Sequence, residues 1–230
     1  GWTEWELVKR AEPRFPGHKQ PNLPAWGETD EADPKDMAQK IDAAADHGID
    51  TFIFDWYWYD DGPFLQRGLD EGFLNAPNND RLKFALMWAN HDWVDIHPIK
   101  ATDNSLENAR LLYPGAVTPE TFETIMDTCI ERYFKHPSYW LLDGCPYFSL
   151  YELTKLIAGF GSVEKTRELF DRFREKVKAA GFKNLHLNAV FWNNPILPGE
   201  NAPTDSKMLA DALGFDSVTS YVWIHHYAPD

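Results

Sequence analysis

The sequence predicts an α/β fold of the (β/α)8 barrel type, with a parallel sheet and helices on its outside. Strands and helices are predicted to alternate along the chain, which is typical of right-handed βαβ units. The predicted strands are almost continuously apolar, as expected where both faces are covered. A series of helix, glycine, strand and tryptophan recurs at Gly48 to Trp56, Gly181 to Trp192 and Gly214 to Trp223. Because no Gly-rich phosphate loop follows a strand, a barrel is favoured over an open doubly wound sheet.

Capping residues mark where the helices begin. Residues 1–32 are rich in Pro, Gly and Trp without a regular period, so we expect an irregular N-terminal loop. Asp33 and Thr118 are N-cap residues that are each followed by proline, and Ser162 opens a further helix. Apolar residues then recur at helical spacing. The predicted helices cover residues 33–48, 64–73, 118–133, 162–181 and 205–213.

Five apolar runs are predicted to form the parallel strands. They are Ile49–Trp56, Leu82–Trp88, Pro146–Tyr151, Leu185–Trp192 and Ser217–Trp223. A barrel of this type closes with eight strands, so the five predicted strands are too few to close it. The simplest interpretation is that residues 1–230 form a single domain that is a fragment of such a barrel, from just after its first strand through its sixth.

Charge and composition argue against several classes of partner. The formal net charge of −14 would be repelled by nucleic acid and by an anionic membrane surface, but a neutral glycan would not be repelled. No apolar run approaches the ~18 residues of a membrane span. Cys129 and Cys145 are expected to serve packing and indicate no disulfide framework.

Aromatic residues stand beside polar ones at the end of each predicted strand. In a parallel barrel these ends converge on one face, where ligands bind. Flat apolar rings next to hydrogen-bonding groups suit sugars, which carry C–H faces and hydroxyls, so we predict a saccharide site on this face. The candidate substrate-binding residues are Asp55, Trp56, Trp58, Tyr59, Trp88, Asn90, His91, Asp92, Tyr151, Glu152, Trp192, Asn193, Tyr221, Trp223, His225 and His226.

For several of these residues a structural role is the alternative. Asp55 is expected either to face the ligand or to be held by backbone amides. Trp88 is interpreted as a stacking platform, with Asn90 and His91 as partners for hydroxyls, although the segment would also suit a loop anchored by its own hydrogen bonds. Glu152 is either a secondary carboxylate near the reacting sugar or a favourable charge in the first turn of a helix.

Neither a metal site nor a catalytic pair can be assigned by spacing. His225 and His226 are adjacent on a strand and would point to opposite faces, which is poor geometry for a shared zinc ion. We therefore predict no metal and no cofactor. Glycoside hydrolysis usually requires two carboxyl groups that flank the scissile bond. Asp55, Asp92 and Glu152 lie on separate strands and form no convincing pair, so the catalytic residues stay unassigned.

Several segments resemble one family of carbohydrate-active proteins. They are GWTEW at 1–5, QPNLP at 20–24, DP at 33–34, GIDTFIFDWYWY at 48–59 and KFALMWAN at 83–90. Taken together, they make the chain resemble the WbsX-type family, which is related to glycoside hydrolase family 99, the endo-α-mannosidase group. The resemblance extends over essentially the whole chain, and its most specific part is residues 48–93.

This resemblance implies a (β/α)8 barrel that hydrolyses α-linked, mannose-like glycans. Catalysis in the family 99 relatives is attributed to two glutamates in an Asn-Glu-Trp-x-Glu-Gly motif late in the barrel. No such run occurs here, so the resemblance implies a catalytic pair beyond Asp230 and leaves open whether the fragment is active alone. The alternatives are a glycosyltransferase of bacterial surface or lipopolysaccharide polysaccharide synthesis and a noncatalytic glycan-binding barrel. A hydrolase would be periplasmic or secreted, and a glycosyltransferase cytoplasmic.

Overall fold

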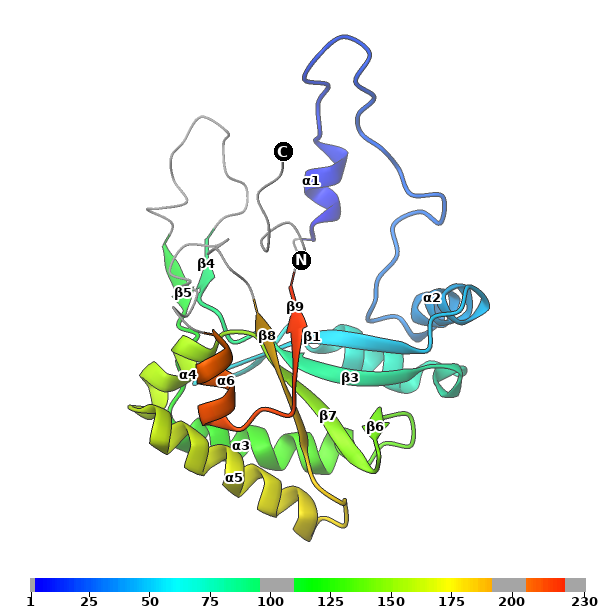
Figure 1. The fold of residues 1–230 in the computed structure, drawn as a ribbon. Helices are drawn as coiled ribbons and strands as arrows, with labels where there is room; N and C mark the ends of the chain where they lie inside the picture. The colour runs from blue at the N-terminus through cyan, green and yellow to red at the C-terminus, as the bar shows by residue number, and fades with distance from the viewer. Residues whose placement is uncertain (1–2, 96–109, 192–205, 222–230) are drawn as a thin grey trace.

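A computed structural model describes residues 3–95, 110–191 and 206–221, and five parallel strands form its main sheet (Figure 1). These strands are β1 (Thr51–Tyr59), β3 (Lys83–Trp88), β7 (Cys145–Leu150), β8 (His186–Phe191) and β9 (Ser217–Ser220). They lie in the sheet in the order in which they occur in the chain. The five parallel strands predicted from the apolar runs are thereby confirmed.

Four short strands are added to this arrangement. β2 (Gly62–Phe64) pairs antiparallel with the carboxyl end of β1, and β6 (Leu141–Leu142) pairs antiparallel with β7. β4 (Trp93–Val94) and β5 (Leu111–Tyr113) form a separate antiparallel pair within residues that the sequence predicted as loop. β2 follows β1 and the β4–β5 pair follows β3, so both lie next to the strand ends where the saccharide site was predicted.

The helices begin where the capping residues predicted. The α-helices are α1 (Trp5–Lys9), α2 (Pro34–Asp46), α3 (Pro119–Thr128), α4 (Leu153–Phe160), α5 (Val163–Ala179) and α6 (Ser206–Leu213). The side chains of Asp33, Thr118 and Ser162 each accept a hydrogen bond from a backbone N–H in the first turn of α2, α3 and α5. α1 was not predicted and interrupts the expected N-terminal loop, while α4 was foreseen only in the alternative that Glu152 begins a helix.

Two predicted helical segments depart from α geometry. The helix expected over 64–73 consists of the π-helix η1 (Gly68–Gly72) and the 3-10 turn η2 (Phe73–Asn75). The end of the helix expected over 118–133 is the π-helix η4 (Cys129–Phe134), and a further 3-10 turn, η3 (Asn79–Arg81), precedes β3. Spacing alone could not distinguish these tightened and widened turns from an α-helix, because the buried positions recur similarly.

One face of the sheet is covered by helices and holds the core. Figure 1 shows α3 and α5 together along this side of the strands. The indole of Trp88 stacks on Phe122 of α3 with ring centroids 5.8 Å apart, and Trp56 Nε1 donates to the Tyr133 hydroxyl of η4 at 3.4 Å. Alternating residues of each strand therefore fill this apolar layer, as strand geometry requires.

The opposite face carries a row of mainly polar residues that Met87 interrupts. Register across the sheet aligns Asp55 of β1 with Met87, Ser149, Asn188 and Ser217 of the next four strands. Partners in a parallel sheet share a face, so these five side chains lie on the face away from the core. The parallel sheet with helices on one side is consistent with a (β/α)8-type fold. Within the described segments, no helix combines the length and the apolar character needed to cross a bilayer.

Candidate functional site

A connected set of rings lies at the carboxyl ends of the parallel strands. The Tyr57 ring centroid is 5.9 Å from that of His91 and 5.4 Å from that of Trp93. His91 in turn contacts Tyr151 at 5.6 Å, and Tyr151 contacts Tyr221 at 5.2 Å. These rings come from β1, the segment after β3, the end of β7 and the end of β9, so four of the five strand ends are brought together, as predicted.

Asp55 lies on the same face as Tyr57 and is open to solvent. Surrounding protein nevertheless reduces the hydration of the carboxylate, which raises the pKa of Asp55, and the positive charge that His91 can carry opposes this effect. Burial, followed by the negative charges of Asp55 and Tyr221, raises the pKa of Tyr57 to about 12. The Asp55 carboxylate and the Tyr57 hydroxyl therefore act on one another, with Tyr57 a neutral hydrogen-bonding group at ordinary pH.

The His91 imidazole is enclosed by rings. It is buried, and its Nδ1 lies 2.8 Å from the backbone oxygen of Asp92. Desolvation lowers the pKa of His91, partly offset by that hydrogen bond and by the charges of Asp92 and Asp55. A lowered pKa keeps the ring neutral at pH 7, so Nδ1–H donates to the Asp92 carbonyl and the ring supports Tyr57 and Tyr151.

Asn90 and Glu152 hold two strand ends together. Asn90 Nδ2 donates to the Glu152 carbonyl at 2.7 Å, and the Glu152 N–H donates to Asn90 Oδ1 at 2.8 Å. Glu152 Oε1 accepts from the Thr154 N–H at 3.0 Å and caps α4. Both residues are buried. The amide of Asn90 is thus engaged within the protein, and its predicted contact with sugar hydroxyls stays a prediction. Glu152 is the N-cap of α4, one residue before the first turn in which its structural alternative placed it.

Asp92 is also committed to the protein. Its Oδ1 accepts from the Gly115 N–H at 2.7 Å, and its Oδ2 forms an ion pair with Lys155 Nζ at 2.7 Å. A side chain at Gly115 would collide with the backbone of the Asn90–Asp92 segment, so the two loops approach as only glycine permits. Both carboxylate oxygens of Asp92 thus anchor this loop, and its predicted contact with substrate stays a prediction.

Four aromatic candidates face away from the site or are enclosed. Trp56 and Trp88 are buried in the helix-facing core, and Trp58 lies on the same side, 5.4 Å from Trp56. Tyr59 is buried with its hydroxyl donating to the His91 carbonyl at 3.3 Å. Strand alternation turns the tryptophans toward the helices, and the β4–β5 pair covers Tyr59, whose ring stacks on Tyr113. The sugar-binding role expected of these four residues stays a prediction.

The remaining candidates divide into two groups. Asp55, His91, Tyr151 and Tyr221 belong to the assembled strand-end surface. Trp192, Asn193, Trp223, His225 and His226 lie outside the described residues. Across 3–95, 110–191 and 206–221, no three His, Cys, Asp or Glu side chains are arranged to hold a metal ion.

Two residues that the candidate set omitted belong to this surface. Tyr57 shares its strand face with Asp55, and period-two alternation alone would have selected it in place of Trp56 and Trp58. Trp93 stacks beside His91 with centroids 6.0 Å apart and ends the same aromatic segment. The many aromatic and polar residues at 87–93 drew attention to this segment in the sequence. The orientation of each ring, however, depends on the residue at which β3 ends.

A hydrogen-bonded polar network lies next to this surface, on the same face of β7, β8 and β9. Ser149 Oγ donates to Asn188 Oδ1 at 2.8 Å, and Asn188 Nδ2 donates to Ser217 Oγ at 2.9 Å. His186 Nε2 is 2.8 Å from the same Ser217 oxygen. These side chains follow Asp55 in the row across the sheet and give that face a polar middle, which a purely structural core would not need.

Comparisons with known proteins agree with this architecture. The family profile described as "Glycosyltransferase WbsX" matches residues 1–223. The "Uncharacterized protein WxcX" of Xanthomonas campestris pv. campestris is 36% identical over 95 residues, which is 41% of this chain and 13% of WxcX.

Two solved structures are similar. The GH99 endo-α-mannosidase of Bacteroides thetaiotaomicron superposes with a TM-score of 0.53 at 12% identity, over 87% of this chain and 50% of that one. A "glycoside hydrolase-like protein" gives a TM-score of 0.46 at 20% identity, over 73% of this chain and 46% of the other. The chain thus spans about half the length of the endo-α-mannosidase, and the likeness to it is one of fold.

Proposed function

Because the chain belongs to the glycosyltransferase WbsX family, we propose that it forms the substrate-binding part of a carbohydrate-active barrel enzyme. The observation that carries this proposal is the surface at the strand ends, where Asp55 and Tyr57 of β1 meet Trp93 of β4, Tyr151 after β7 and Tyr221 after β9. We define these residues, with His91, as the strand-end surface. Its substrate is a glycan with α-linked, mannose-like sugars, and its reaction is hydrolysis.

The chemistry of the strand-end surface suits a neutral sugar. Tyr221 is 45% exposed and Tyr57 is partly exposed, so aromatic area remains for the C–H face of a sugar ring. The Asp55 carboxylate accepts hydrogen bonds from hydroxyls, and the neutral Tyr57 hydroxyl both donates and accepts. A nearby carboxylate disfavours a phosphate or a uronic acid, because like charges repel.

We also propose that further strands complete the barrel beside β9. Ile53, on the face of Asp55, is 48% exposed, and Val218 of the edge strand β9 is 54% exposed. Among the described residues β9 pairs only with β8, and a strand edge without a partner invites a further strand. We expect strands from the remainder of the protein to pair with β9 and to complete the barrel.

The reacting carboxylates are assigned to that remainder. Glycosidic cleavage requires two carboxyl groups on either side of the bond. Among the described residues, Asp55 is the carboxylate on the strand-end surface, while Asp92 and Glu152 are anchored elsewhere. Asp55 therefore serves to hold and orient the sugar, with the catalytic pair supplied by the rest of the barrel.

A glycosyltransferase is the second candidate, because the matching family is described by that activity. The two reactions are separated by incubating the full protein with α-linked manno-oligosaccharides, with and without UDP- or GDP-sugars, and analysing products by mass spectrometry. Shortened oligosaccharides without a nucleotide sugar are expected. Products that lengthen only when a nucleotide sugar is present would establish transfer and overturn hydrolysis.

A further inference from the structure

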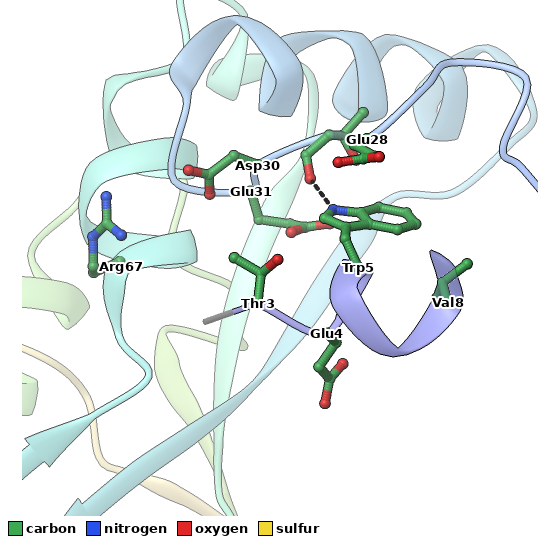
Figure 2. A pocket seen from close by; sticks show the side chains of 9 residues that line it. Thr3, Glu4, Trp5, Val8, Glu28, Asp30, Glu31 and Arg67 are labelled. Atoms are coloured by element: carbon green, nitrogen blue, oxygen red, sulfur yellow. Dashed lines mark hydrogen bonds between the residues drawn. The ribbon is translucent and has the colours of Figure 1, made fainter. Parts of the chain in front are cut away.

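A cavity of about 530 Å³ lies between the N-terminal segment and the loop that precedes α2 (Figure 2). Side chains that surround it include Thr3, Trp5, Glu28, Asp30, Glu31 and Arg67. Its volume falls within the range of about 300–1,000 Å³ that is typical of small-ligand sites. The cavity is separate from the strand-end surface, since none of the residues of that surface lines it.

Specific contacts hold the walls of this cavity in place. Trp5 Nε1 donates to the Thr29 carbonyl at 3.0 Å, which joins α1 to the loop before α2 (Figure 2). Lys9 Nζ pairs with Glu28 at 2.9 Å across the same junction, and Lys40 of α2 pairs with Glu31. A cavity with tethered walls needs little ordering when a ligand enters, which favours binding.

The opposite wall depends on a close backbone contact. A Cβ atom at Gly72 of η1 would lie 1.8 Å from the Glu31 carbonyl oxygen, so only glycine permits this approach. η1 carries the chain onward from β2, which pairs with the carboxyl end of β1. α2 returns from the loop at 28–33 toward the start of β1. The cavity therefore lies at the same end of the sheet as Asp55 and Tyr57.

The lining combines an aromatic ring with hydrogen-bond acceptors. Trp5 also lines an adjoining cavity of about 390 Å³, which includes Trp26, whose side chain is 51% exposed. Glu31 and Thr29 are shared by both cavities. Indole rings offer a flat apolar surface to sugar C–H faces, carboxylates accept from hydroxyls, and Arg67 supplies donors.

The balance of charge selects among possible ligands. Four acidic residues line the first cavity, and two of them, Glu28 and Glu31, are paired with lysines. Arg67 on the same wall is paired with Glu71 at 2.9 Å, so the charges of the other two acids, Glu4 and Asp30, are the excess. A nucleotide or another polyanion would meet net negative charge. A molecule rich in hydroxyls and without charge satisfies the same acceptors without that cost.

We infer that the cavity between Trp5 and Arg67 binds a neutral saccharide unit, at a subsite distinct from the strand-end surface. The inference rests on the proposed function in taking a glycan as the ligand. Because no residue of the strand-end surface lines this cavity, the subsite contributes to recognition of further sugar units and not to bond cleavage.

Two variants of the full protein test this subsite by opposite means. Trp5→Leu removes the aromatic platform but keeps an apolar side chain, and Thr3→Trp adds a ring that fills the cavity without removing a wall. The probes are α-linked mannotetraose, maltotetraose and cellotetraose, titrated by calorimetry. We expect both variants to weaken binding of the preferred tetrasaccharide by about tenfold or more, with the unfolding midpoint of Thr3→Trp unchanged.

Phe15→Leu is the matched control, since Phe15 is an exposed aromatic residue of the same segment and lines neither cavity. It is expected to bind as the wild type does. Wild-type affinity in Thr3→Trp, or no binding of any tetrasaccharide by the unmodified protein, would overturn the subsite. Weakened binding in both variants without hydrolysis would instead keep the subsite and reject the proposed reaction.

Discussion

Asp55 combines exposure to water with reduced hydration, and this combination makes it the most informative single residue of the strand-end surface. Its carboxylate is open, yet nearby protein raises its pKa. A carboxylate that served only solubility would be fully hydrated, and its pKa would not be raised by nearby protein. An acid that binds hydroxyls benefits from them, because hydrogen bonds to a poorly hydrated carboxylate are stronger.

Asp55→Asn is expected to weaken kcat/KM for an oligosaccharide by about 10- to 100-fold, since a hydrogen bond to a charged group contributes about 1.5–3 kcal/mol. Because the pKa of Asp55 is raised, binding that needs the carboxylate should decline with falling pH before an ordinary aspartate would protonate. The measurement is kcat/KM against pH in both proteins. Asp61→Asn, in the exposed turn after β1, is the control, and an equal loss there would contradict the assignment.

Glu152, unlike the exposed Asp55, is a carboxyl group inside the protein. Its side chain is buried and caps α4, and desolvation raises its pKa above the usual value. The folded state then holds a proton more tightly than the unfolded state does. Ionisation of Glu152 therefore costs stability as pH rises from the ordinary glutamate pKa through the raised one.

Glu152→Gln should accordingly be as stable as the wild type at pH 7 or more stable, because the amide oxygen keeps the cap without a buried charge. Glu152→Ala should lose about 1–2 kcal/mol, since the cap is removed. Urea unfolding at pH 5 and pH 7 measures both effects. If Glu152→Gln lost as much stability at pH 7 as Glu152→Ala, the charge itself would be required and this explanation would fail.

Helices and strands that are specified by local sequence signals were predicted, whereas those that depend on contacts between distant segments were not. N-cap residues and apolar runs predicted α2, α3, α5 and the five parallel strands, because those signals are local. The π-helices, α4 and the β4–β5 pair depend on tertiary contacts. The candidate residues included both Asp55 and Trp56, although these two are adjacent and alternation sends only one of them to a given face of the sheet.

The contact between η1 and the loop before α2 gives a test at this scale. Gly72→Ala should cost about 1–3 kcal/mol, because the added methyl group would force the Glu31 backbone to move. Gly68→Ala is the matched control in the same π-helix, where the added methyl would meet the Glu31 side chain at an ordinary 3.4 Å. Thermal unfolding of the two variants compares them, and equal stability would show that the contact is not restrictive.

For the whole molecule, the account depends on a polar face of a parallel sheet whose carboxyl end is lined with rings. The net charge of −14 and the acidic surroundings of both proposed sugar-binding sites favour an uncharged ligand over a nucleotide or an anionic polymer. Membership of the glycosyltransferase WbsX family is in keeping with the glycan proposed as that ligand.

The most direct measurement is a crystal structure of the full protein with an α-linked manno-oligosaccharide bound. We predict a sugar ring packed against Tyr57 or Tyr221, with a hydroxyl within hydrogen-bond distance of the Asp55 carboxylate. Saccharide density that avoids the ends of β1, β7 and β9 altogether, in crystals where those ends are open to solvent, would contradict the assignment of this surface.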